Sequence, residues 1–149
     1  MATTIHYIDD DSDDLAYFKY ALDEINQKVK LHTHSNPFSF VNQLENVCKE
    51  HPLIFIDINM PGKNGFELLK EIRETLICKR VPIVMISTSD NPKSILISKE
   101  LGANLYAVKP NNIGDLKKML ADLVSREWSK VLIEDSNFVV NGAHGNKVS

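Results

Sequence analysis

Two runs in the middle of the chain are apolar at every position, Leu53–Ile56 and Ile83–Ile86. Runs of this length suit strands, and a strand without a polar face must be covered on both sides. Such strands are typical of parallel sheets, whose crossover helices cover both faces. Asp57 ends the first run, while Pro82 precedes the second and Ser87 follows it. These runs therefore predict the centre of a parallel sheet.

Weaker apolar runs predict three further strands, Ile5–Ile8, Val29–Thr33 and Leu105–Val108. Between the strands, apolar residues recur at the three- and four-residue spacing of an amphipathic helix. The residues that mark these helices are Leu15, Phe18, Leu22 and Ile25, then Phe38, Val41, Leu44 and Cys48, then Leu69, Ile72 and Leu76, then residues 92 to 101, and finally Leu116, Met119, Leu120, Leu123 and Val124. Five strand–helix pairs in strict alternation predict an α/β fold, a doubly wound five-stranded parallel sheet with right-handed crossovers.

Length and composition fit one globular domain, with 149 residues of which 43% are hydrophobic and 25% charged. We expect this domain to span residues 1–128. Residues 129–149 then form an extension that is partly disordered, packs on the domain or makes a homodimer contact. The sequence has neither the long apolar run of a membrane helix nor a secretory signal, which predicts a cytoplasmic protein. A net charge of −3 without a basic run argues against a nucleic-acid partner.

The cysteine pair and one histidine pair could suggest a disulfide or a metal site, but the sequence around them supports neither. Cys48 and Cys78 are far apart in sequence and lack the Cys/His spacing of a zinc site. In a reducing compartment we expect them to be small, buried or half-buried apolar residues and not a disulfide. His32 and His34 fall on one face of a predicted strand, but without a third ligand nearby we expect surface histidines.

The residues that follow the predicted strands form a chemically consistent set. Acids follow the first strand, Asp57 ends the third, Ser87 follows the fourth and Lys109 follows the fifth. Sites of open parallel sheets lie at the carboxyl ends of the strands, so these residues should meet at one edge. Mg²⁺ prefers carboxylate and other oxygen ligands, and a carboxylate can attack phosphorus to form an acyl phosphate. The set therefore predicts a site that holds Mg²⁺ and a phosphoryl group.

Each of these features also has a simpler interpretation. The acidic run of residues 9–14 could cap a helix, because acids favour a helix N-terminus. Asp57 could be a turn former, and Ser87 and Thr88 could cap the end of a strand. Tyr106 could be a packing aromatic. Trp128 could pack the C-terminal extension onto the domain or lie in a dimer contact.

Six motifs occur in a specific order and spacing: Ile8–Asp11, Phe55–Gly62, Asn64–Gly65, Ile86–Thr88, Gly102–Ala103 and Val108–Pro110. Each is weak alone. Together, over roughly residues 4–128, they give a sequence that resembles the receiver domains of bacterial response regulators. The resemblance implies a flavodoxin-like (βα)5 fold with strand order 2-1-3-4-5.

Carried over residue by residue, the resemblance implies that Asp57 accepts a phosphoryl group. Asp10, Asp57 and the backbone carbonyl of Asn59 would bind Mg²⁺, while Asp9 would contribute through water. Lys109 would pair with a phosphoryl oxygen.

The resemblance also implies a switch. Ser87, in place of the commoner threonine, would supply the switch hydroxyl. Tyr106 stands where the family has an aromatic rotamer switch, which would couple Ser87 to the surface of the last two helices and the strand between them. The Lys109–Pro110 bond matches a position that is commonly cis in the family.

These expectations describe a single-domain response regulator of a two-component phosphorelay. It would be a signalling protein and not an enzyme, apart from catalysing its own phosphotransfer and dephosphorylation. Its partners would be a sensor histidine kinase or phosphotransfer protein and an unknown downstream protein. Asp13–Asp14, Ser-Thr-Ser at 87–89 and Trp128 look most like single-domain receivers that partner phytochrome-type kinases.

Three alternatives use a similar fold. A degenerate receiver would act as an interaction module without phosphorylation. An aspartyl-phosphate phosphatase needs a second acid two residues after its nucleophile, where this chain has Asn59. A flavodoxin-like FMN carrier needs a phosphate loop after the first strand, and the aspartates there would repel the ligand.

Overall fold

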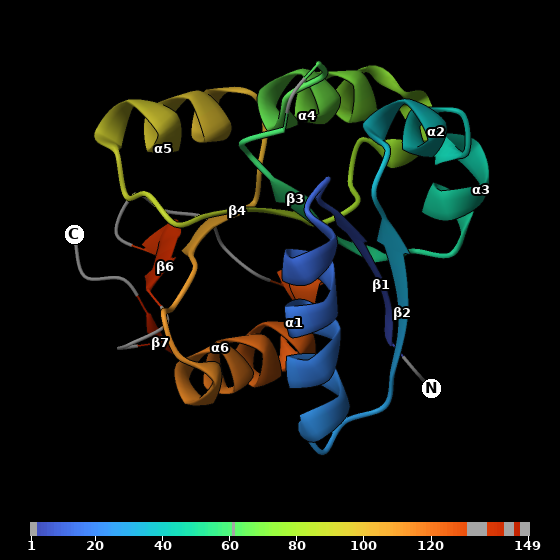
Figure 1. The fold of residues 1–149 in the computed structure, drawn as a ribbon. Helices are drawn as coiled ribbons and strands as arrows, with labels where there is room; N and C mark the ends of the chain where they lie inside the picture. Colours follow the sequence, from blue (N-terminus) through green and yellow to red (C-terminus); the bar gives the residue numbers. More distant parts are fainter. Residues whose placement is uncertain (1–2, 61, 131–136, 142–144, 147–149) are drawn as a thin grey trace.

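The computed structural model describes residues 3–60, 62–130, 137–141 and 145–146. One sheet runs through this part of the chain in the order β2-β1-β3-β4-β5-β6-β7 (Figure 1). The strands are β1 (Thr3–Ile8), β2 (Val29–His34), β3 (Leu53–Asp57), β4 (Ile83–Ser87), β5 (Leu105–Val108), β6 (Val139–Asn141) and β7 (Gly145–Asn146). The first five are parallel to their neighbours and confirm the predicted order 2-1-3-4-5. Among the described residues, no helix is both long and apolar enough to cross a membrane.

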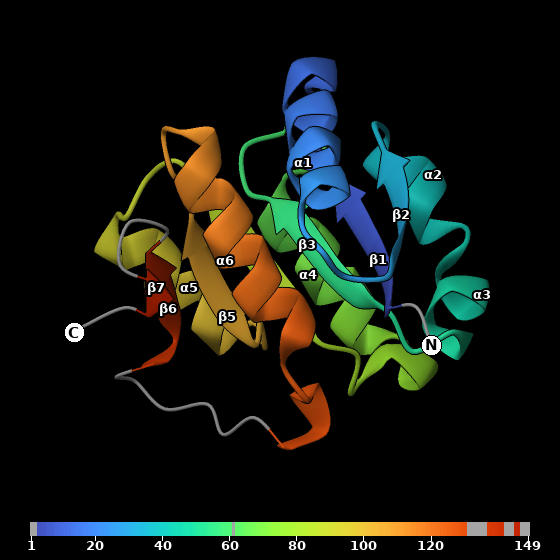
Figure 2. The ribbon, with the colours of Figure 1, turned by 90° about the horizontal axis from the view of Figure 1, so that it is seen from below.

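Helices cover both faces of the sheet, which gives the molecule three layers. The helices α1 (Ser12–Glu24) and α6 (Ile113–Ser125) lie on one face (Figures 1 and 2). The other face carries α2 (Pro37–Val41), α3 (Leu44–Lys49), α4 (Gly65–Glu74) and α5 (Pro92–Glu100). The 3₁₀ turns η1 (Leu76–Cys78) and η2 (Trp128–Lys130) follow α4 and α6.

The central strands β3 and β4 are buried at every position, as their unbroken apolar sequence predicts. Alternate side chains enter two separate cores, because successive residues of a strand point to opposite faces. Phe55 packs with the α1 and α6 side chains, whereas Ile54 and Ile56 pack on the side of α2 to α5.

The single helix that the sequence predicts over residues 38–48 is wrong, because α2 and α3 are separate short helices. Asn36 caps α2 and accepts hydrogen bonds from the Phe38 and Ser39 amides. Phe38 is 56% exposed, so it does not belong to the buried face. A break of two residues keeps Phe40 and Leu44 in one core, and the apolar spacing cannot reveal it.

The prediction for the cysteines is also wrong. Cys48 of α3 and Cys78 of η1 form a disulfide, with Cα atoms 5.5 Å apart. Both residues are buried, as predicted. The fold brings α3 against η1, and a sequence spacing of 30 residues gives no sign of that contact.

Part of the C-terminal extension completes the sheet. β6 pairs parallel to β5, and the Tyr106 amide donates to the Phe138 carbonyl at 2.9 Å. Phe138 is only 1% exposed and packs in the core on the α5 side. Trp128 is half-buried, and its indole N–H donates to the Leu123 carbonyl at 3.1 Å. The neighbouring Val131 and Leu132 lie outside the described residues.

Docking of the extension should make a large contribution to stability. We predict that Phe138→Ala lowers the free energy of unfolding by about 3–5 kcal/mol, as for other buried Phe→Ala changes. Urea unfolding measures this. Ser129→Ala, at an exposed position before β6, should change the free energy by less than about 0.5 kcal/mol. Equal, small effects of both substitutions would contradict a docked extension.

The disulfide should stabilise the folded chain by constraining the unfolded one. We predict that reduction lowers the free energy of unfolding by about 3–4 kcal/mol, the value expected for a closed loop of this length. Urea unfolding with and without reductant measures the loss, and a Cys48→Ala/Cys78→Ala variant should not respond to reductant. Two alkylatable thiols in protein unfolded without reductant would contradict the bond.

Candidate functional site

The carboxyl ends of β1, β3, β4 and β5 lie at one edge of the sheet because these strands are parallel. Asp9 follows β1, Asp57 ends β3, Ser87 ends β4 and Lys109 follows β5. The Lys109 amide donates to the Ser87 carbonyl at 2.7 Å, which continues the strand pairing into the loop. Four residues that are far apart in sequence are thereby brought to one place, as predicted.

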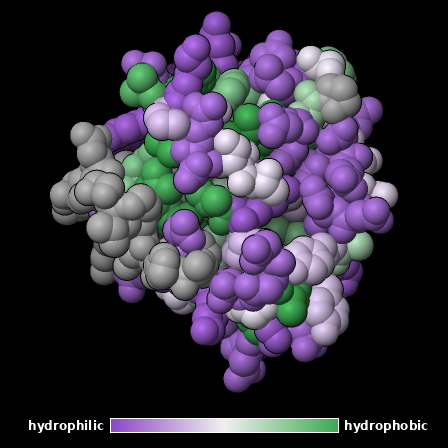
Figure 3. All heavy atoms as spheres, turned by 60° about the vertical axis from the view of Figure 1, so that its left-hand side comes forward, coloured by the Kyte–Doolittle hydropathy of each residue, from purple (hydrophilic) through white to green (hydrophobic). Residues whose placement is uncertain are grey.

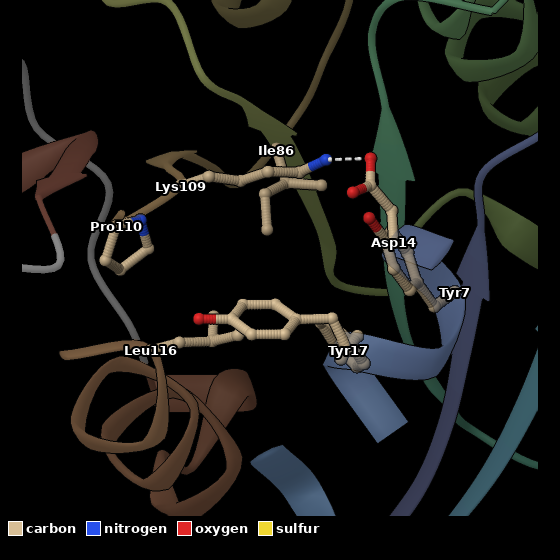
Figure 4. A pocket seen from close by; sticks show the side chains of 8 residues that line it. Tyr7, Asp14, Tyr17, Ile86, Lys109, Pro110 and Leu116 are labelled. Atoms are coloured by element: carbon tan, nitrogen blue, oxygen red, sulfur yellow. Dashed lines mark hydrogen bonds and ion pairs between the residues drawn. The ribbon is translucent and has the colours of Figure 1, made fainter. Parts of the chain in front are cut away.

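The Lys109 ammonium group is surrounded by three carboxylates. Its Nζ atom lies 3.4 Å from Asp57 Oδ1, 3.2 Å from Asp14 Oδ2 and 3.5 Å from Asp9 Oδ2. Figure 4 shows the side chain reaching from the end of β5 towards Asp14 of α1, above a pocket whose lining includes Tyr17. Burial alone would lower the pKa of Lys109, but the three carboxylates raise it above its usual value. Lys109 is therefore a permanent cation at neutral pH.

Asp9 is a buried acid held in a fixed position. It is 1% exposed, accepts a hydrogen bond from the Tyr7 hydroxyl at 2.7 Å and accepts one from the Asp11 amide at 3.0 Å. Burial raises the pKa of Asp9, while the bonds from Tyr7 and Asp11 and the charge of Lys109 oppose the rise. These donors fix which way its oxygens face.

Asp57 is 7% exposed at the centre of the site. Its pKa is raised to about 6, because burial and the charges of Asp9 and Asp14 together outweigh the lowering effect of Lys109. Binding of a further cation would lower the pKa of Asp57, because added positive charge favours the ionised form of an acid.

The donor set suits a hard divalent cation such as Mg²⁺. One carboxylate oxygen from each of Asp9, Asp10 and Asp57 lies within 4.8 Å of the others. Asp10 is exposed, so the group opens to solvent on that side. Mg²⁺ keeps several waters and binds one or two carboxylates, which a half-open cluster of this kind allows. The Asn59 side chain is exposed beside it.

Gly65 holds the loop between β3 and α4 close to Asp57. Its amide donates to the Ile58 carbonyl at 3.0 Å. A Cβ atom at this position would lie only 2.5 Å from the Asp57 backbone oxygen and 2.8 Å from Ile58 Cα. Only glycine allows the loop to approach so closely, which explains this residue of the Asn64–Gly65 motif.

Ser87 and Tyr106 meet at the loop that follows β4. The Ser87 hydroxyl oxygen accepts a hydrogen bond from the Ser89 amide at 3.1 Å. Tyr106 is fully buried, and its hydroxyl donates to the Ser89 carbonyl at 2.7 Å. Burial raises the pKa of Tyr106, with the Ser87 hydroxyl close enough to oppose the rise. One short loop therefore links both residues.

Two members of the site were missed by the sequence reasoning. Asp14 makes the shortest of the three Lys109 contacts, and Tyr7 orients Asp9. Asp14 lies in the first turn of α1, where an acid has an ordinary helix-end explanation. That explanation does hold for Asp11, whose side chain accepts from the Asp13 and Asp14 amides as the N-cap. The only sequence sign that Asp14 belongs to the site was its position five residues after Asp9.

Two expectations near the site are not met. The Lys109–Pro110 bond is trans, since none of the described peptide bonds is cis. The trans form is the lower in energy for most bonds that precede proline. The histidines of β2 are not simply surface groups, because His32 and His34 are half-buried and the ring of His6 lies close and nearly parallel to both.

The raised pKa of Asp57 predicts a pH dependence in the metal-free protein. Between about pH 4 and pH 6 the folded state keeps a proton that the unfolded state has lost, so stability falls as pH rises. Asp57→Asn removes this penalty, which for a shift of about two units is about 3 kcal/mol. We predict that the variant is more stable than wild type at pH 7.5 and that the difference vanishes near pH 4. Urea unfolding with a chelator measures it, and a variant less stable than wild type at pH 7.5 would contradict it.

Comparisons with known proteins agree with this geometry. The family model described as "Response regulator receiver domain" matches residues 5–121. Response regulator Rcp1 of Synechocystis sp. is 41% identical over 73 residues, 49% of this chain and 50% of Rcp1. Two-component response regulator ARR17 of Arabidopsis thaliana is 37% identical over 84 residues, 56% of this chain and 54% of its own. The chain thus spans about half the length of the curated relatives it matches.

Solved structures show the same similarity over more of the chain. The Mn(2+)-bound form of response regulator Rcp1 superimposes with a TM-score of 0.71 at 28% identity, over 89% of this chain and 99% of Rcp1. The phosphorylated cyanobacterial phytochrome response regulator RcpA gives a TM-score of 0.73 at 26% identity, over 91% of this chain and 100% of RcpA. Fold, strand-end residues and family match agree, and the chain belongs to the response regulator receiver domain family.

Proposed function

We propose that this chain is a phosphoacceptor of a cytoplasmic two-component relay, and that Asp57 receives the phosphoryl group. The observation that carries the proposal is the position of Asp57. It is a buried carboxylate 3.4 Å from a lysine and within 4.8 Å of oxygens from Asp9 and Asp10. The donor is a histidine kinase or a phosphotransfer protein, and the output is a changed protein contact.

The transfer requires one new bond and one broken bond. A carboxylate oxygen of Asp57 attacks phosphorus and forms an acyl phosphate. The bond from phosphorus to the donor's imidazole nitrogen breaks, and the nitrogen keeps the electron pair and later takes a proton from water. The Lys109 Nζ atom lies 3.4 Å from Asp57 Oδ1, close enough to pair with an oxygen of the incoming phosphoryl group. Such transfers depend mostly on positioning and charge neutralisation.

Mg²⁺ is the cation that we propose for the acidic cluster. Asp10, Asp57 and the Asn59 backbone carbonyl would bind it, with Asp9 acting through water. Bound there, the ion would neutralise the charge of the phosphoryl oxygens. The related response regulator Rcp1 has a Mn(2+)-bound form, which supports a divalent cation here.

Phosphorylation would act through the loop that joins Ser87 to Tyr106. The Ser87 hydroxyl, now an acceptor for the Ser89 amide, would turn to donate to the phosphoryl group. The Tyr106 hydroxyl donates a hydrogen bond to the Ser89 carbonyl, so the Tyr106 side chain would move with the loop. The phosphoryl group thereby biases two states, by no more than its differential stabilisation of them.

The surface that reports this change is proposed to be that of α5 and its neighbours. Figure 3 shows apolar side chains gathered on the side of the molecule that carries α5 and β6 in Figure 1. Leu96 of α5 is 56% exposed there. β6 pairs with the edge of β5, so a partner would meet α5 and β6 and not β5 itself.

The proposed phosphoryl donor is a phytochrome-type kinase, which the similarity to RcpA supports. Failure of every such kinase to phosphorylate Asp57 would reject that assignment.

Phosphoryl uptake from acetyl phosphate tests the proposal. We predict that wild type incubated with Mg²⁺ gains the mass of one phosphoryl group and that Asp57→Asn gains none. Lys109→Gln should slow uptake by about 10²-fold, the size typical for loss of one charge-stabilising group. Asp23→Asn removes a surface acid that pairs with Lys19 and should behave as wild type.

Intact-protein mass spectrometry over a time course measures all four proteins. Equal uptake by wild type and Asp57→Asn would show that the acceptor lies elsewhere. Absence of uptake from both acetyl phosphate and a phosphorylated kinase would favour an interaction module that works without phosphorylation.

A further inference from the structure

A cluster of histidines lies inside the layer between the sheet and the short helices α2 and α3. His6 of β1 is 5% exposed. Its ring stacks between the rings of His32 and His34 of β2, at centroid distances of 4.7 and 5.1 Å, and also lies near Phe40 of α2. These side chains take no part in the proposed phosphoryl chemistry.

One nitrogen of His6 lacks a partner. Nδ1 of His6 lies 2.8 Å from Nε2 of His34, a hydrogen-bond distance. Nε2 of His6 is the only buried side-chain nitrogen or oxygen without a hydrogen-bond partner in the described part of the chain. Leaving a buried polar atom unpaired costs about 1–3 kcal/mol. An atom in this position calls for a ligand.

A carboxylate completes a set of three donors. Glu50, the residue that follows α3, brings an oxygen close to His6 and His32. One ligand atom from each of the three residues lies within 4.8 Å of the others. Because Nδ1 of His6 is bonded to His34, Nε2 is the nitrogen that remains to join this set.

We propose that His6, His32 and Glu50 bind a divalent transition-metal ion of the Zn²⁺ type, with His34 positioning the His6 ring. Two imidazoles and one carboxylate form a known class of zinc ligand set, in which water fills the fourth position. Metal-bound histidines almost always donate their second N–H to an acceptor, and His34 is placed to take it from Nδ1 of His6.

The electrostatics of the cluster agree with metal binding. Burial lowers the pKa of His6 to about 3, with His34 and His32 adding to the effect. Burial lowers the pKa of His34 to about 4, together with the charge of His32. Both rings are therefore neutral at pH 7, and neutral imidazole is the form that binds metals.

Binding requires the ring of His32 to turn, because an ion lies in the plane of each imidazole that binds it and the rings of His6 and His32 are nearly parallel. Ligand atoms of a tetrahedral zinc site are about 3.3 Å apart, given bond lengths of about 2.0 Å. Glu50 is exposed and His32 is half-buried, so both side chains can turn towards the ion. The ion would then link β1, β2 and the end of α3. Nitrogen donors separate this site from the oxygen-only acidic cluster, which suits Mg²⁺.

Zinc titration of the full chain tests the proposal. The background carries Asp10→Asn, which weakens the acidic cluster, and reductant is omitted so that Cys48 and Cys78 stay bonded. We expect calorimetry to find one Zn²⁺ per chain. His32→Gln and Glu50→Gln, at half-buried and exposed positions, should each weaken binding at least tenfold. His34→Gln should weaken it by about 10–100-fold, the usual cost of losing a partner of a ligand.

A matched control is available beside Glu50. His51 is exposed, and its φ of 53° is one that asparagine adopts readily. His51→Asn should therefore bind Zn²⁺ as the parent does. Zn²⁺ should raise the melting temperature of the parent and of His51→Asn but not that of His32→Gln. In the chain with Asp10 intact, His32→Gln should still take up phosphoryl groups as wild type does. Zinc affinity equal in parent and His32→Gln, or no zinc binding by the parent, would overturn the proposal.

Discussion

The ion-pair cluster around Lys109 is the interaction on which the candidate site depends. One half-buried ammonium group pairs with three carboxylates, from Asp9, Asp14 and Asp57, so the negative charges of the site outnumber the positive one. Removing charged groups from water costs free energy, and the attraction between one cation and three anions offsets this desolvation cost only in part. Burial raises the pKa of Asp57 against the opposing charge of Lys109, and the charges of Asp9 and Asp14 add to the rise. The excess negative charge also favours binding of a divalent cation. The charge balance of the metal-free site therefore favours binding of a cation, and a bound cation would in turn favour binding of a phosphoryl group.

The fold supplies that cluster by simple means. Parallel strands place Asp9, Asp57 and Lys109 at one edge, at the carboxyl ends of β1, β3 and β5, although these residues are about fifty positions apart in sequence. The close approach of Gly65 fixes the loop beside Asp57. The Tyr106 hydroxyl donates to the loop after β4, and its ring belongs to the same buried core cluster as Phe138 of the extension. The extension therefore belongs to the same packing unit as the proposed switch.

The sequence predicts the parts of this structure that depend on local pattern. Unbroken apolar runs identified β3 and β4, and the polar residue at each strand end identified Asp57, Ser87 and Lys109. Features that depend on packing between distant segments were missed. The Cys48–Cys78 bond arises from contact between α3 and η1, and the pairing of β6 with β5 arises from a docked tail.

Two side chains show why composition and spacing could not reveal the remainder. Asp14 sits at a helix start, where an acid is expected anyway. His6 lies in a strand whose pattern reads as buried, and its pairing with His32 follows only from the register of β1 and β2.

Chemical mapping of the phosphorylated residue tests the central claim most directly. Borohydride reduces an aspartyl phosphate to homoserine, with loss of phosphate, and leaves ordinary carboxylates unchanged. After phosphorylation with acetyl phosphate and Mg²⁺, reduction and proteolysis, peptide mass spectrometry should find homoserine at position 57 and nowhere else. Homoserine at position 9, 10 or 14, or a phosphorylated chain that yields no homoserine, would contradict the assignment of Asp57 as the acceptor.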